Sequence, residues 1–434
     1  MYDYIIVGSG LSGLNTARLI NKSNRKICIL EKSNKIGGLI QSKYINIFTK
    51  KKKNKHKNKT KKNKHKNKNK KIKIETGGAV IYSYQKNMID LIKKYNIGVK
   101  KIPIKYTKKE VWSGNKSKKP FHVNHYNKFK NLLKKVFDYI DKKGKSYCRK
   151  YTFEQICLEV LSFKETRFLE HCYGYSSEFR GANAVVAKKN IKNELFNTDY
   201  FYVFKKGYSN LLKCIYNDIK DNITLKKNCS IVSFHEKNNC IEVKTNKNTL
   251  KCKKLILAIP KKPLLDMCTS FNENEKKLLN SVNSMSLTRI FAKYDLKKKK
   301  NHWMKKLNFS TINNPLCQII PISKQHGLFQ ISYSDWYFAD YWGHLSIDNT
   351  KKLIKKLLKE TFDYFIDDPI FIKKYYWKDA IHFWKPNINE IETHKKILHL
   401  RKNVYIVGES YSLNQGWGEG AIQTSISLSK LLNK

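Results

Sequence analysis

A glycine-rich turn near the start of the sequence constrains the fold more than any other feature. The apolar run Tyr4-Ile-Ile-Val is typical of a strand buried on both faces, and it leads directly into Gly8-Ser-Gly10-Leu-Ser-Gly13. A helix is predicted from about Ser12 to Asn21, and a second strand from Lys26 to Leu30. Strand, turn, helix and strand in this order form a βαβ unit with parallel strands. The sequence therefore predicts an α/β domain.

The three glycines of this turn suit a bound dinucleotide. The first permits the tight turn, the second lets the backbone approach a pyrophosphate, and the third lets the helix pack on the strand. Glu31 follows at the end of the predicted second strand, where a carboxylate can accept hydrogen bonds from a ribose. The alternative is an ordinary glycine turn beside a surface glutamate. Position, strand context and acid together favour the dinucleotide.

Two further glycine pairs indicate a long cofactor. Gly37-Gly38-Leu39 follows Glu31, and Gly77-Gly78-Ala79 follows a lysine-rich tract. Glycine pairs at these places would let the backbone run close against an extended flavin and its diphosphate, although such pairs also form ordinary turns. They favour FAD over NAD.

The chain resembles the flavin-containing amine oxidase family over nearly its whole length. The resemblance is carried by the opening segment from Gly8 to Gly38 and by the closing segment Val407-Gly-Glu409-Ser-Tyr…Gln415-Gly-Trp417-Gly-Glu-Gly420-Ala421-Ile. This family includes monoamine and polyamine oxidases, histone lysine demethylases and, more distantly, protoporphyrinogen oxidase. The resemblance implies an FAD-dependent oxidoreductase that transfers a hydride from a small-molecule substrate, with an amine as the leading guess, to flavin N5. It also implies that oxygen reoxidises the flavin and gives hydrogen peroxide.

The resemblance also implies cofactor contacts. Glu409 would bind the ribityl chain, the segment from Gly418 to Ile422 would present helix N-terminal amides to the flavin, and Ile231 would hold the adenine through its backbone. The alternative for the closing segment is a glycine-rich turn that caps a helix. The predicted cofactor residues are Gly8, Ser9, Gly10, Leu11, Ser12, Gly13, Glu31, Lys32, Gly37, Gly38, Leu39, Gly77, Gly78, Ala79, Ile231, Gly408, Glu409, Gly418, Ala421 and Ile422.

The sequence departs from the family pattern after the first glycine pair. Leu39 stands where an arginine is frequent, which puts one phosphate contact in doubt. No cysteine follows Cys317, in the region where some members attach the flavin covalently. We therefore expect noncovalent FAD, and no metal.

Three residues are candidates for the reaction centre. Arg289 stands where many members have a lysine near flavin N5; the alternative is that it pairs with a carboxylate or faces solvent. Trp417 aligns with one aromatic wall of the family's substrate cage and would flank a cation; the alternative is core packing. The other wall should come from residues 377–386, where Ile381 or His382 replaces a tyrosine. His382 is a candidate proton acceptor, and the alternative is a structural histidine.

The chain is predicted to form two domains. A discontinuous, Rossmann-like FAD-binding domain comprises residues 1–90, 200–262 and 396–434, and a substrate domain of mixed sheet and helices comprises 91–199 and 263–395. Apolar residues at positions 129, 132, 133, 136, 137 and 140 predict an amphipathic helix, and a helical pattern continues over 153–168. A closing helix is predicted over about 420–432. Asp335-Trp336 and Tyr341-Trp342 are expected in the core.

The formal net charge of +54 is extreme, and 15 lysines without an acid lie between Lys50 and Lys73. The tract 50–71 lacks apolar periodicity, which predicts a disordered insertion. Lysine, asparagine and isoleucine are frequent throughout, as in an A+T-rich genome such as that of a large DNA virus. We favour this interpretation over selection for nucleic-acid binding.

The ten cysteines show no CxxC pair, which favours free thiols in a reducing compartment. The opening strand leaves no room for a signal peptide, and no apolar run approaches the ~18 residues of a membrane span. We therefore expect a soluble, intracellular protein, in the cytoplasm or in a virion.

Three other functions stay open. A flavin desaturase or protoporphyrinogen-oxidase-like enzyme would suit the missing lysine and the incomplete cage. An NAD-dependent oxidoreductase is disfavoured by the closing segment. A nucleic-acid-binding protein with a vestigial flavin fold would lose a salt-dependent affinity on deletion of residues 50–71.

Overall fold

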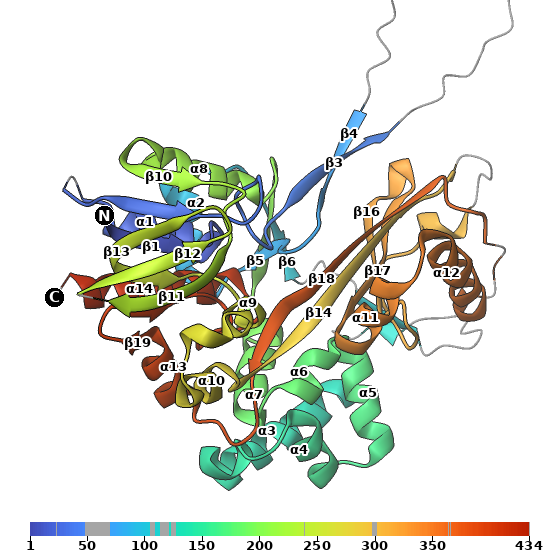
Figure 1. The fold of residues 1–434 in the computed structure, drawn as a ribbon. Helices are drawn as coiled ribbons and strands as arrows, with labels where there is room; N and C mark the ends of the chain where they lie inside the picture. The colour runs from blue at the N-terminus through green and yellow to red at the C-terminus, as the bar shows by residue number, and fades with distance from the viewer. Residues whose placement is uncertain are drawn as a thin grey trace, which may run out of the picture.

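The computed structural model describes residues 1–22, 24–47, 70–104, 109–112, 121–122, 127–237, 239–296, 302–362, 364 and 366–433. The predicted insertion at 50–71 lies outside these ranges except for its last two residues, which begin a strand. Two sheets dominate the molecule, and a group of helices lies below them in the view of Figure 1. Both termini lie beside the first sheet.

The first sheet has eight strands in the order β10-β2-β1-β13-β12-β11, with β20 paired to β13 and β19 paired to β20. The pairs β10–β2, β2–β1, β1–β13 and β13–β20 are parallel. All of β2 and the last four residues of β1 are buried, as predicted for strands covered on both faces. The strands are β1 (Tyr2–Val7), β2 (Ile27–Leu30), β10 (Ile223–Lys226), β11 (Ile231–Lys237), β12 (Cys240–Thr245), β13 (Thr249–Leu257), β19 (His399–Arg401) and β20 (Val404–Ile406).

Helix α1 packs beside α8 and α14 next to this sheet, and α14 also contacts α2. Their buried apolar side chains form one core with those of β1 and β2. This arrangement confirms the predicted βαβ unit and the closing helix. The bounds are α1 (Leu11–Ile20), α2 (Lys86–Lys94), α8 (Ser209–Ile219) and α14 (Gly418–Leu432).

The second sheet has seven strands in the order β18-β14-β17-β16-β15-β7-β8. It is mixed, because β15 runs parallel to β7 and the other pairs are antiparallel. The long strands β14 and β18 reach from this sheet towards the first one (Figure 1). The bounds are β7 (Lys109–Trp112), β8 (Phe121–His122), β14 (Val282–Lys293), β15 (Phe309–Ile312), β16 (Gln318–Ser323), β17 (Leu328–Asp335) and β18 (Phe371–Trp384), with α11 (Trp336–His344) and α12 (Ile347–Phe362) packed nearby.

The helical group begins with α3, whose buried face includes the six predicted apolar positions. The helical pattern over 153–168 resolves into two helices. The split occurs because Ser162 caps a new helix: its side chain accepts from Glu165 N, and the Glu165 carboxylate accepts from Ser162 N. The helices are α3 (Asn127–Cys148), α4 (Phe153–Val160), α5 (Phe163–Tyr173), α6 (Ser176–Gly181) and α7 (Ala184–Leu195).

Two small sheets and three short helices connect these parts. The three-stranded sheet β5-β9-β6 crosses the predicted domain boundaries, since β6 and its partner β9 come from segments assigned to different domains. The exact division into domains therefore stays a prediction. The remaining bounds are β3 (Ser42–Ile47), β4 (Lys70–Glu75), β5 (Val80–Tyr82), β6 (Val99–Pro103), β9 (Tyr200–Phe204), α9 (Lys261–Asp266), α10 (Glu273–Leu279) and α13 (Glu390–Leu398).

The predicted core aromatics near position 340 divide into buried and exposed ones. Trp342 is buried, and its Nε1 donates to Pro315 O at 2.6 Å. Asp335 is also buried and accepts from Ser177 N at 2.9 Å. Tyr341 is 41% exposed, so its assignment to the core is wrong. It shares a helix with Trp342 and lies on the outward side.

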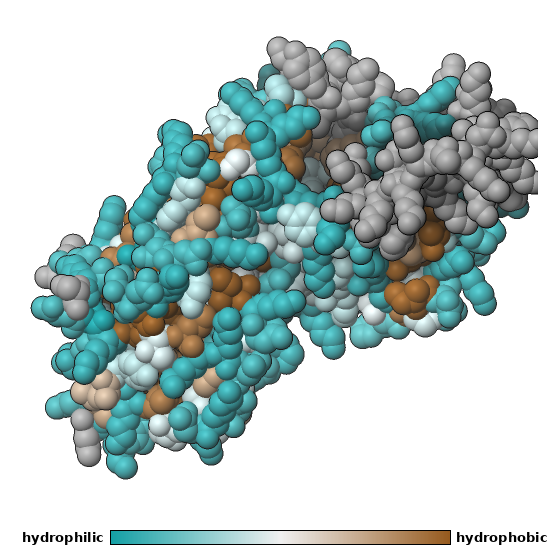
Figure 2. All heavy atoms as spheres, turned by 90° about the horizontal axis from the view of Figure 1, so that it is seen from above, coloured by the Kyte–Doolittle hydropathy of each residue, from teal (hydrophilic) through white to brown (hydrophobic). Residues whose placement is uncertain are grey.

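The surface agrees with the hydrophilic composition. Hydrophilic residues cover most of the face in Figure 2, and hydrophobic atoms show between them. All ten cysteines are free, as expected. In the described ranges we find no helix with the length and apolarity needed to cross a lipid bilayer.

Candidate cofactor and substrate site

The opening turn has two glycines that no other residue can replace without backbone movement. Gly8 directly follows β1 and has a φ of +103°, and a Cβ there would lie 2.5 Å from Ala258 O. A Cβ on Gly13 would lie 1.9 Å from Gly8 O. Gly10 differs, because nothing lies within 4 Å of the position of its Cβ. The first and third glycines therefore serve packing, and the second leaves an open approach to the backbone.

Glu31 is fixed beneath this turn. Its Oε2 accepts from Ser9 N at 3.0 Å and from Ser9 Oγ at 2.5 Å, and its Oε1 accepts from Ser33 N at 2.9 Å. A carboxylate oxygen has more than one lone pair, so Glu31 retains capacity for a ribose hydroxyl. The neighbouring Lys32 side chain is exposed.

The segment before β11 lies beside Glu31. Cys229 N donates to Glu31 O at 2.9 Å, and Asn228 N donates to Ser33 O at 3.1 Å. Ile231 follows as the first residue of β11. The strand expected at the adenine end thus starts next to the carboxylate expected at the ribose.

The glycine pairs continue from the opening turn. Gly38 lies against Gly10, whose Cα is 3.5 Å from the position of a Gly38 Cβ. The Leu39 carbonyl oxygen lies 1.9 Å from the position of a Gly77 Cβ. Glycine segments from three parts of the sequence therefore approach one another closely, and among their glycines Gly38 is exposed and Gly10 is half-buried.

The closing segment meets the opening one at α1 and α14. Ser425 Oγ donates to Ser12 O at 3.1 Å, and the two hydroxyl oxygens are 3.5 Å apart. A Cβ on Gly418, the first residue of α14, would lie 3.2 Å from Leu11 Cδ2. Ala421 and Ile422 are buried further along this helix.

Two helix N-termini at this place lack side-chain caps. Gly10, which has no side chain, precedes α1. Trp417 precedes α14, and its side chain makes no hydrogen bond to the helix amides. Free N–H groups at a helix start favour anions and carbonyl oxygens. With the open backbone at Gly10, this donor set fits the diphosphate and ring of FAD.

Glu409 follows the end of β20 and is held on both oxygens. Its Oε1 accepts from Gly416 N at 2.6 Å, and its Oε2 lies 2.9 Å from His382 Nδ1. The other ring nitrogen, Nε2, lies 2.9 Å from Asp379 Oδ1. His382 and Glu409 are thus brought together, from residues predicted to serve the substrate and the cofactor separately.

The two carboxylates decide the charge of His382. Burial alone would lower the pKa of this histidine, but Glu409 and Asp379 raise it to about 9. The ring is therefore a cation at neutral pH, with both nitrogens donating. This geometry contradicts the predicted role of His382 as a proton acceptor, because no ring lone pair is free.

Trp417 meets an aromatic ring that the sequence analysis missed. Its ring centroid lies 4.9 Å from that of Tyr82 in β5, with an angle of 64° between the planes. Tyr82 also lies 6.1 Å from both Tyr84 and Phe201. The expected second wall from residues 377–386 does not supply this contact. The signal available in the sequence was the position of Tyr82 shortly after Gly77-Gly78.

Arg289 on β14 is buried, at 7% exposure, without an acidic partner among the described residues. Its Nη1 donates weakly, at 3.4 Å, to Glu75 O and to Gln330 Oε1, and its Nε has no acceptor. The guanidinium lies 4.5 Å from the Tyr333 ring centroid. The alternative interpretation of Arg289 therefore fails, since the side chain neither pairs with a described carboxylate nor faces solvent. Its place near flavin N5 stays a prediction.

Acidic side chains on the helical group were also missed. Glu178 is buried and accepts from Tyr173 Oη and, at 3.0 Å, from Asn190 Nδ2. Burial raises the pKa of Glu178 to about 7. Glu194 accepts from Tyr173 Oη at 3.1 Å. The three elements α5, α6 and α7 bring these residues together, and no sequence motif links them.

The acids act on the aromatic residues near Trp417 and Arg289. Burial raises the pKa of both Tyr82 and Tyr175, and the charge of Glu194 raises them further. Tyr175 lies 5.8 Å from Tyr333, the ring under Arg289. Aromatic rings therefore lie between an arginine on one side and carboxylates on the other.

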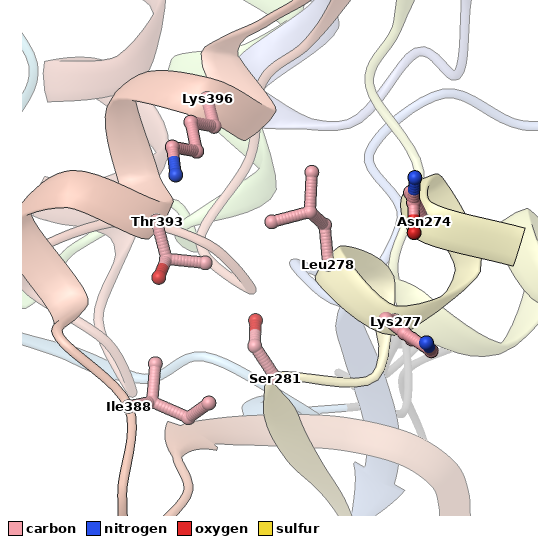
Figure 3. Close-up of a pocket in the computed structure, with 7 residues that line it drawn as sticks. All are labelled: Asn274, Lys277, Leu278, Ser281, Ile388, Thr393 and Lys396. Atoms are coloured by element: carbon pink, nitrogen blue, oxygen red, sulfur yellow. The ribbon is translucent and has the colours of Figure 1, made fainter.

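A separate cavity of about 370 Å³ lies between α10 and α13 (Figure 3). The buried Ser281 hydroxyl points into it and has no hydrogen-bond partner in the described part of the chain. Its other lining residues are Asn274, Lys277, Leu278, Ile388, Thr393 and Lys396. None of them is a predicted cofactor or substrate residue.

Known structures share this fold over their full length. A double mutant of putrescine oxidase superposes with a TM-score of 0.74 at 11% identity, covering 100% of this chain and 99% of the other. Cyclohexylamine oxidase from Brevibacterium oxydans gives 0.74 at 12% identity, with both chains covered completely. A single mutant of putrescine oxidase gives 0.77 at 11% identity, covering 100% and 98%.

The family assignment rests on the sequence itself. The family described as flavin containing amine oxidoreductase matches residues 11–432, from the first residue of α1 to the last of α14. This match begins just after Gly10, so it includes most of the opening segment and the whole closing segment. The chain belongs to the flavin-containing amine oxidoreductase family and is an FAD-dependent oxidoreductase.

Proposed function

We propose that this protein oxidises a small-molecule amine, with noncovalently bound FAD as hydride acceptor and oxygen as electron acceptor. The observation that carries the proposal is the Trp417–Tyr82 ring pair at the start of α14. This pair lies where the closing segment reaches the glycine-lined backbone. Aromatic faces attract ammonium groups and exclude water.

The glycine-lined backbone would hold the cofactor. Gly8, Gly10 and the start of α1 would bind the diphosphate, Glu31 the adenosine ribose, and Glu409 the ribityl chain. Bound FAD supplies the hydride acceptor, so the protein needs to supply orientation, a dry pocket and electrostatics. Noncovalent binding is supported by the absence of cysteine after Cys317.

The substrate side suits a positively charged molecule. The residues that supply ring faces are Tyr82, Tyr175 and Trp417. The negative charge of Glu194 acts on both tyrosines and raises their pKa. Putrescine oxidase and cyclohexylamine oxidase, which share the fold, are named for amine substrates. Both observations support an amine substrate, whereas the buried Arg289 on the same side favours a neutral or anionic one.

The rival desaturase-like function depends on an incomplete aromatic pair. Tyr82 packs edge to face against Trp417, so the two rings contact each other and a substrate would lie beside the pair rather than between its members. Arg289 still departs from the lysine of the family pattern, so the handling of water near the flavin should differ. The ten free thiols support a reducing compartment such as the cytoplasm.

An absorption spectrum followed by anaerobic titration tests the proposal. The purified protein should be yellow, and putrescine, cyclohexylamine or benzylamine should bleach the flavin band, with peroxide released when oxygen returns. W417A should weaken bleaching by at least about tenfold, whereas Y341A, at an exposed ring, should not change it. Bleaching only by a hydroaromatic compound would favour the desaturase, and a colourless protein indifferent to added FAD would overturn the proposal.

A further inference from the structure

Three titratable side chains form a buried row beneath the closing segment. His382 lies between Asp379 and Glu409, with 2.9 Å from each ring nitrogen to a carboxylate oxygen. His382 is only 1% exposed. None of the three takes part in the oxidation proposed above as an acid or base. The row therefore needs another explanation.

Other groups around the row are polar or positively charged. Asp379 accepts from Ser284 Oγ of β14 and, at 3.2 Å, from Lys262 N at the start of α9. Lys261 feels the charge of Asp379, and burial lowers the pKa of Lys261 to about 8; Lys385 lowers it further. The Lys261 ammonium donates to Val282 O at 2.8 Å. The Tyr411 hydroxyl, whose pKa burial raises strongly, is also within the field of Asp379.

Both carboxylate ends of the row are partly exposed, and Glu409 is slightly more exposed than Asp379. The side chain of Glu409 is 19% exposed, while that of His382 is 2% exposed and that of Asp379 is 13% exposed. A buried imidazolium costs free energy unless carboxylates compensate it, and here two do so. The His382 cation thus bonds Glu409 Oε2 on the buried side of this carboxylate. The exposed part of Glu409 faces solvent or a ligand.

The end of β18 holds the closing segment at two further points. Trp384 N donates to Gln415 Oε1 at 2.8 Å, and Trp384 Nε1 donates to Ser412 O at 2.9 Å. The segment itself is bounded by Gly408 and Gly416, both with positive φ, and Gly408 N donates to Thr424 Oγ1 at 2.9 Å. Contacts from β18 and the Gly416 amide together hold Glu409 in place.

We propose that His382 is a positioning residue for the cofactor, which fixes the Glu409 carboxylate at the FAD site and links that site to strand β18 of the second sheet. The inference rests on the proposed function only in taking Glu409 as an FAD contact. An amine substrate is not required.

Two isosteric substitutions separate the two hydrogen bonds of His382. The amide nitrogen of asparagine occupies the place of Nδ1, so H382N keeps a donor to Glu409. The amide nitrogen of glutamine occupies the place of Nε2, so H382Q keeps a donor to Asp379 and loses the one to Glu409. FAD affinity is measured by fluorescence titration of the apoprotein at pH 7.

H382Q should weaken FAD binding by about 10- to 100-fold, the range for a lost hydrogen bond to a charged group. H382N should weaken FAD binding by less than a tenth of the factor measured for H382Q. His394 provides the matched control, because its Nδ1 bonds Tyr411 O at 2.7 Å in the same segment without touching Glu409. H394Q should change the affinity by less than about twofold. Equal losses in H382Q and H394Q would overturn the proposal, as would wild-type affinity in H382Q.

A pH profile gives a readout that a merely structural role would not move. The histidine pKa is raised in the folded protein, so its hold on Glu409 is complete at neutral pH and is lost as pH rises through about 9. FAD affinity should fall over that range in the wild type. D379N removes one carboxylate and should shift the fall to lower pH, and H382N should abolish it. Identical profiles in wild type and D379N would overturn the proposal.

The outcomes are distinct from those for the amine oxidase proposal. FAD binding with the expected His382 dependence, but without bleaching by any amine, would overturn the proposed substrate alone. Bleaching by an amine together with an unchanged FAD affinity in H382Q would overturn the positioning role alone. Thermal midpoints of each apoprotein variant establish that it is folded before the titration.

Discussion

The proposed cofactor side and the proposed substrate side of this molecule are built on different principles. Backbone atoms form the cofactor side, and close contacts such as Gly13 against Gly8 determine their path. Side chains form the substrate side, and Arg289, Trp417 and Glu194 reach it from three separate elements. A site built from backbone depends on where glycine, which lacks a Cβ, stands in the chain, and these positions can be read directly from the sequence. A site built from side chains depends on tertiary packing, which cannot be read from the sequence directly.

Charge differs between the two sides as well. On the cofactor side, Glu31 and Glu409 have their hydrogen bonds satisfied by neighbouring donors. On the substrate side, Arg289 is buried with only weak neutral acceptors, and Glu178 is buried with a raised pKa. The first side is preorganised for its ligand, and the second retains charges that a ligand would meet.

The largest expected effect separates packing glycines from the open one. G13A places a methyl group 1.9 Å from Gly8 O, so the free energy of unfolding should fall by about 3 kcal/mol or more. G10A meets nothing within 4 Å and should fold normally, yet it should weaken FAD binding at least about tenfold, because its methyl group enters the cofactor's space. Urea unfolding and FAD titration measure the two quantities. Tight FAD binding by G10A would contradict the assignment of the open glycine.

The next effect concerns the unpaired arginine. R289M should lower kcat/KM by about 100-fold, because a charge in a dry site acts strongly on reacting groups. The same change should leave the apoprotein stable or raise its unfolding free energy by about 1 kcal/mol, since it removes a buried charge without a carboxylate partner. R289K, which keeps the charge, should have a kcat/KM between that of the wild type and that of R289M. A marked loss of stability in R289M would show that Arg289 serves packing.

A smaller effect tests the buried acid of the helical group. The pKa of Glu178 is raised from 4.5 to about 7, so the folded protein binds this proton more tightly than the unfolded chain. Stability from this group is complete below pH 4.5 and is lost as pH rises to about 7, on the order of 3 kcal/mol in all. E178Q should flatten unfolding free energy against pH over that window. E273Q, at an exposed acid with a lowered pKa, should leave the slope unchanged.

The smallest effect concerns an acid of the closing segment that has a structural role. Glu419 accepts from Asn87 N at 3.2 Å and from Met88 N at 3.0 Å, and so caps the start of α2. E419Q should lower the unfolding free energy by about 1 kcal/mol, because it removes the charge from a helix N-terminus. FAD affinity should stay within about twofold. A larger loss of affinity would show that Glu419 acts at the cofactor site and not only as a cap for α2.

Sequence reasoning succeeded where the signal was local. The strand before Gly8, the helix after it and the buried stripe of α3 all follow from short patterns. The contact between α1 and α14 followed from the resemblance, since no local pattern links segments so far apart. Its hydrogen bond between Ser12 and Ser425 spans almost the whole chain.

The errors of sequence reasoning arose where side chains meet through tertiary packing. His382 was expected at the substrate, but Asp379 and Glu409 occupy both of its nitrogens. Tyr82 was missed because the strand order β5-β9-β6, rather than a motif, brings it to Trp417. Register and packing of this kind cannot be read from one sequence without its structure.

The packing of α1 against α14 also sets the order of events during synthesis. A ribosome adds roughly 5–20 residues per second, so the turn at Gly8 emerges many seconds before Gly418 exists. Until then the opening βαβ unit supplies only part of the proposed cofactor site, and the face of α1 that α14 covers remains exposed to solvent. The proposed cofactor site therefore cannot be complete until nearly the whole chain has been synthesised.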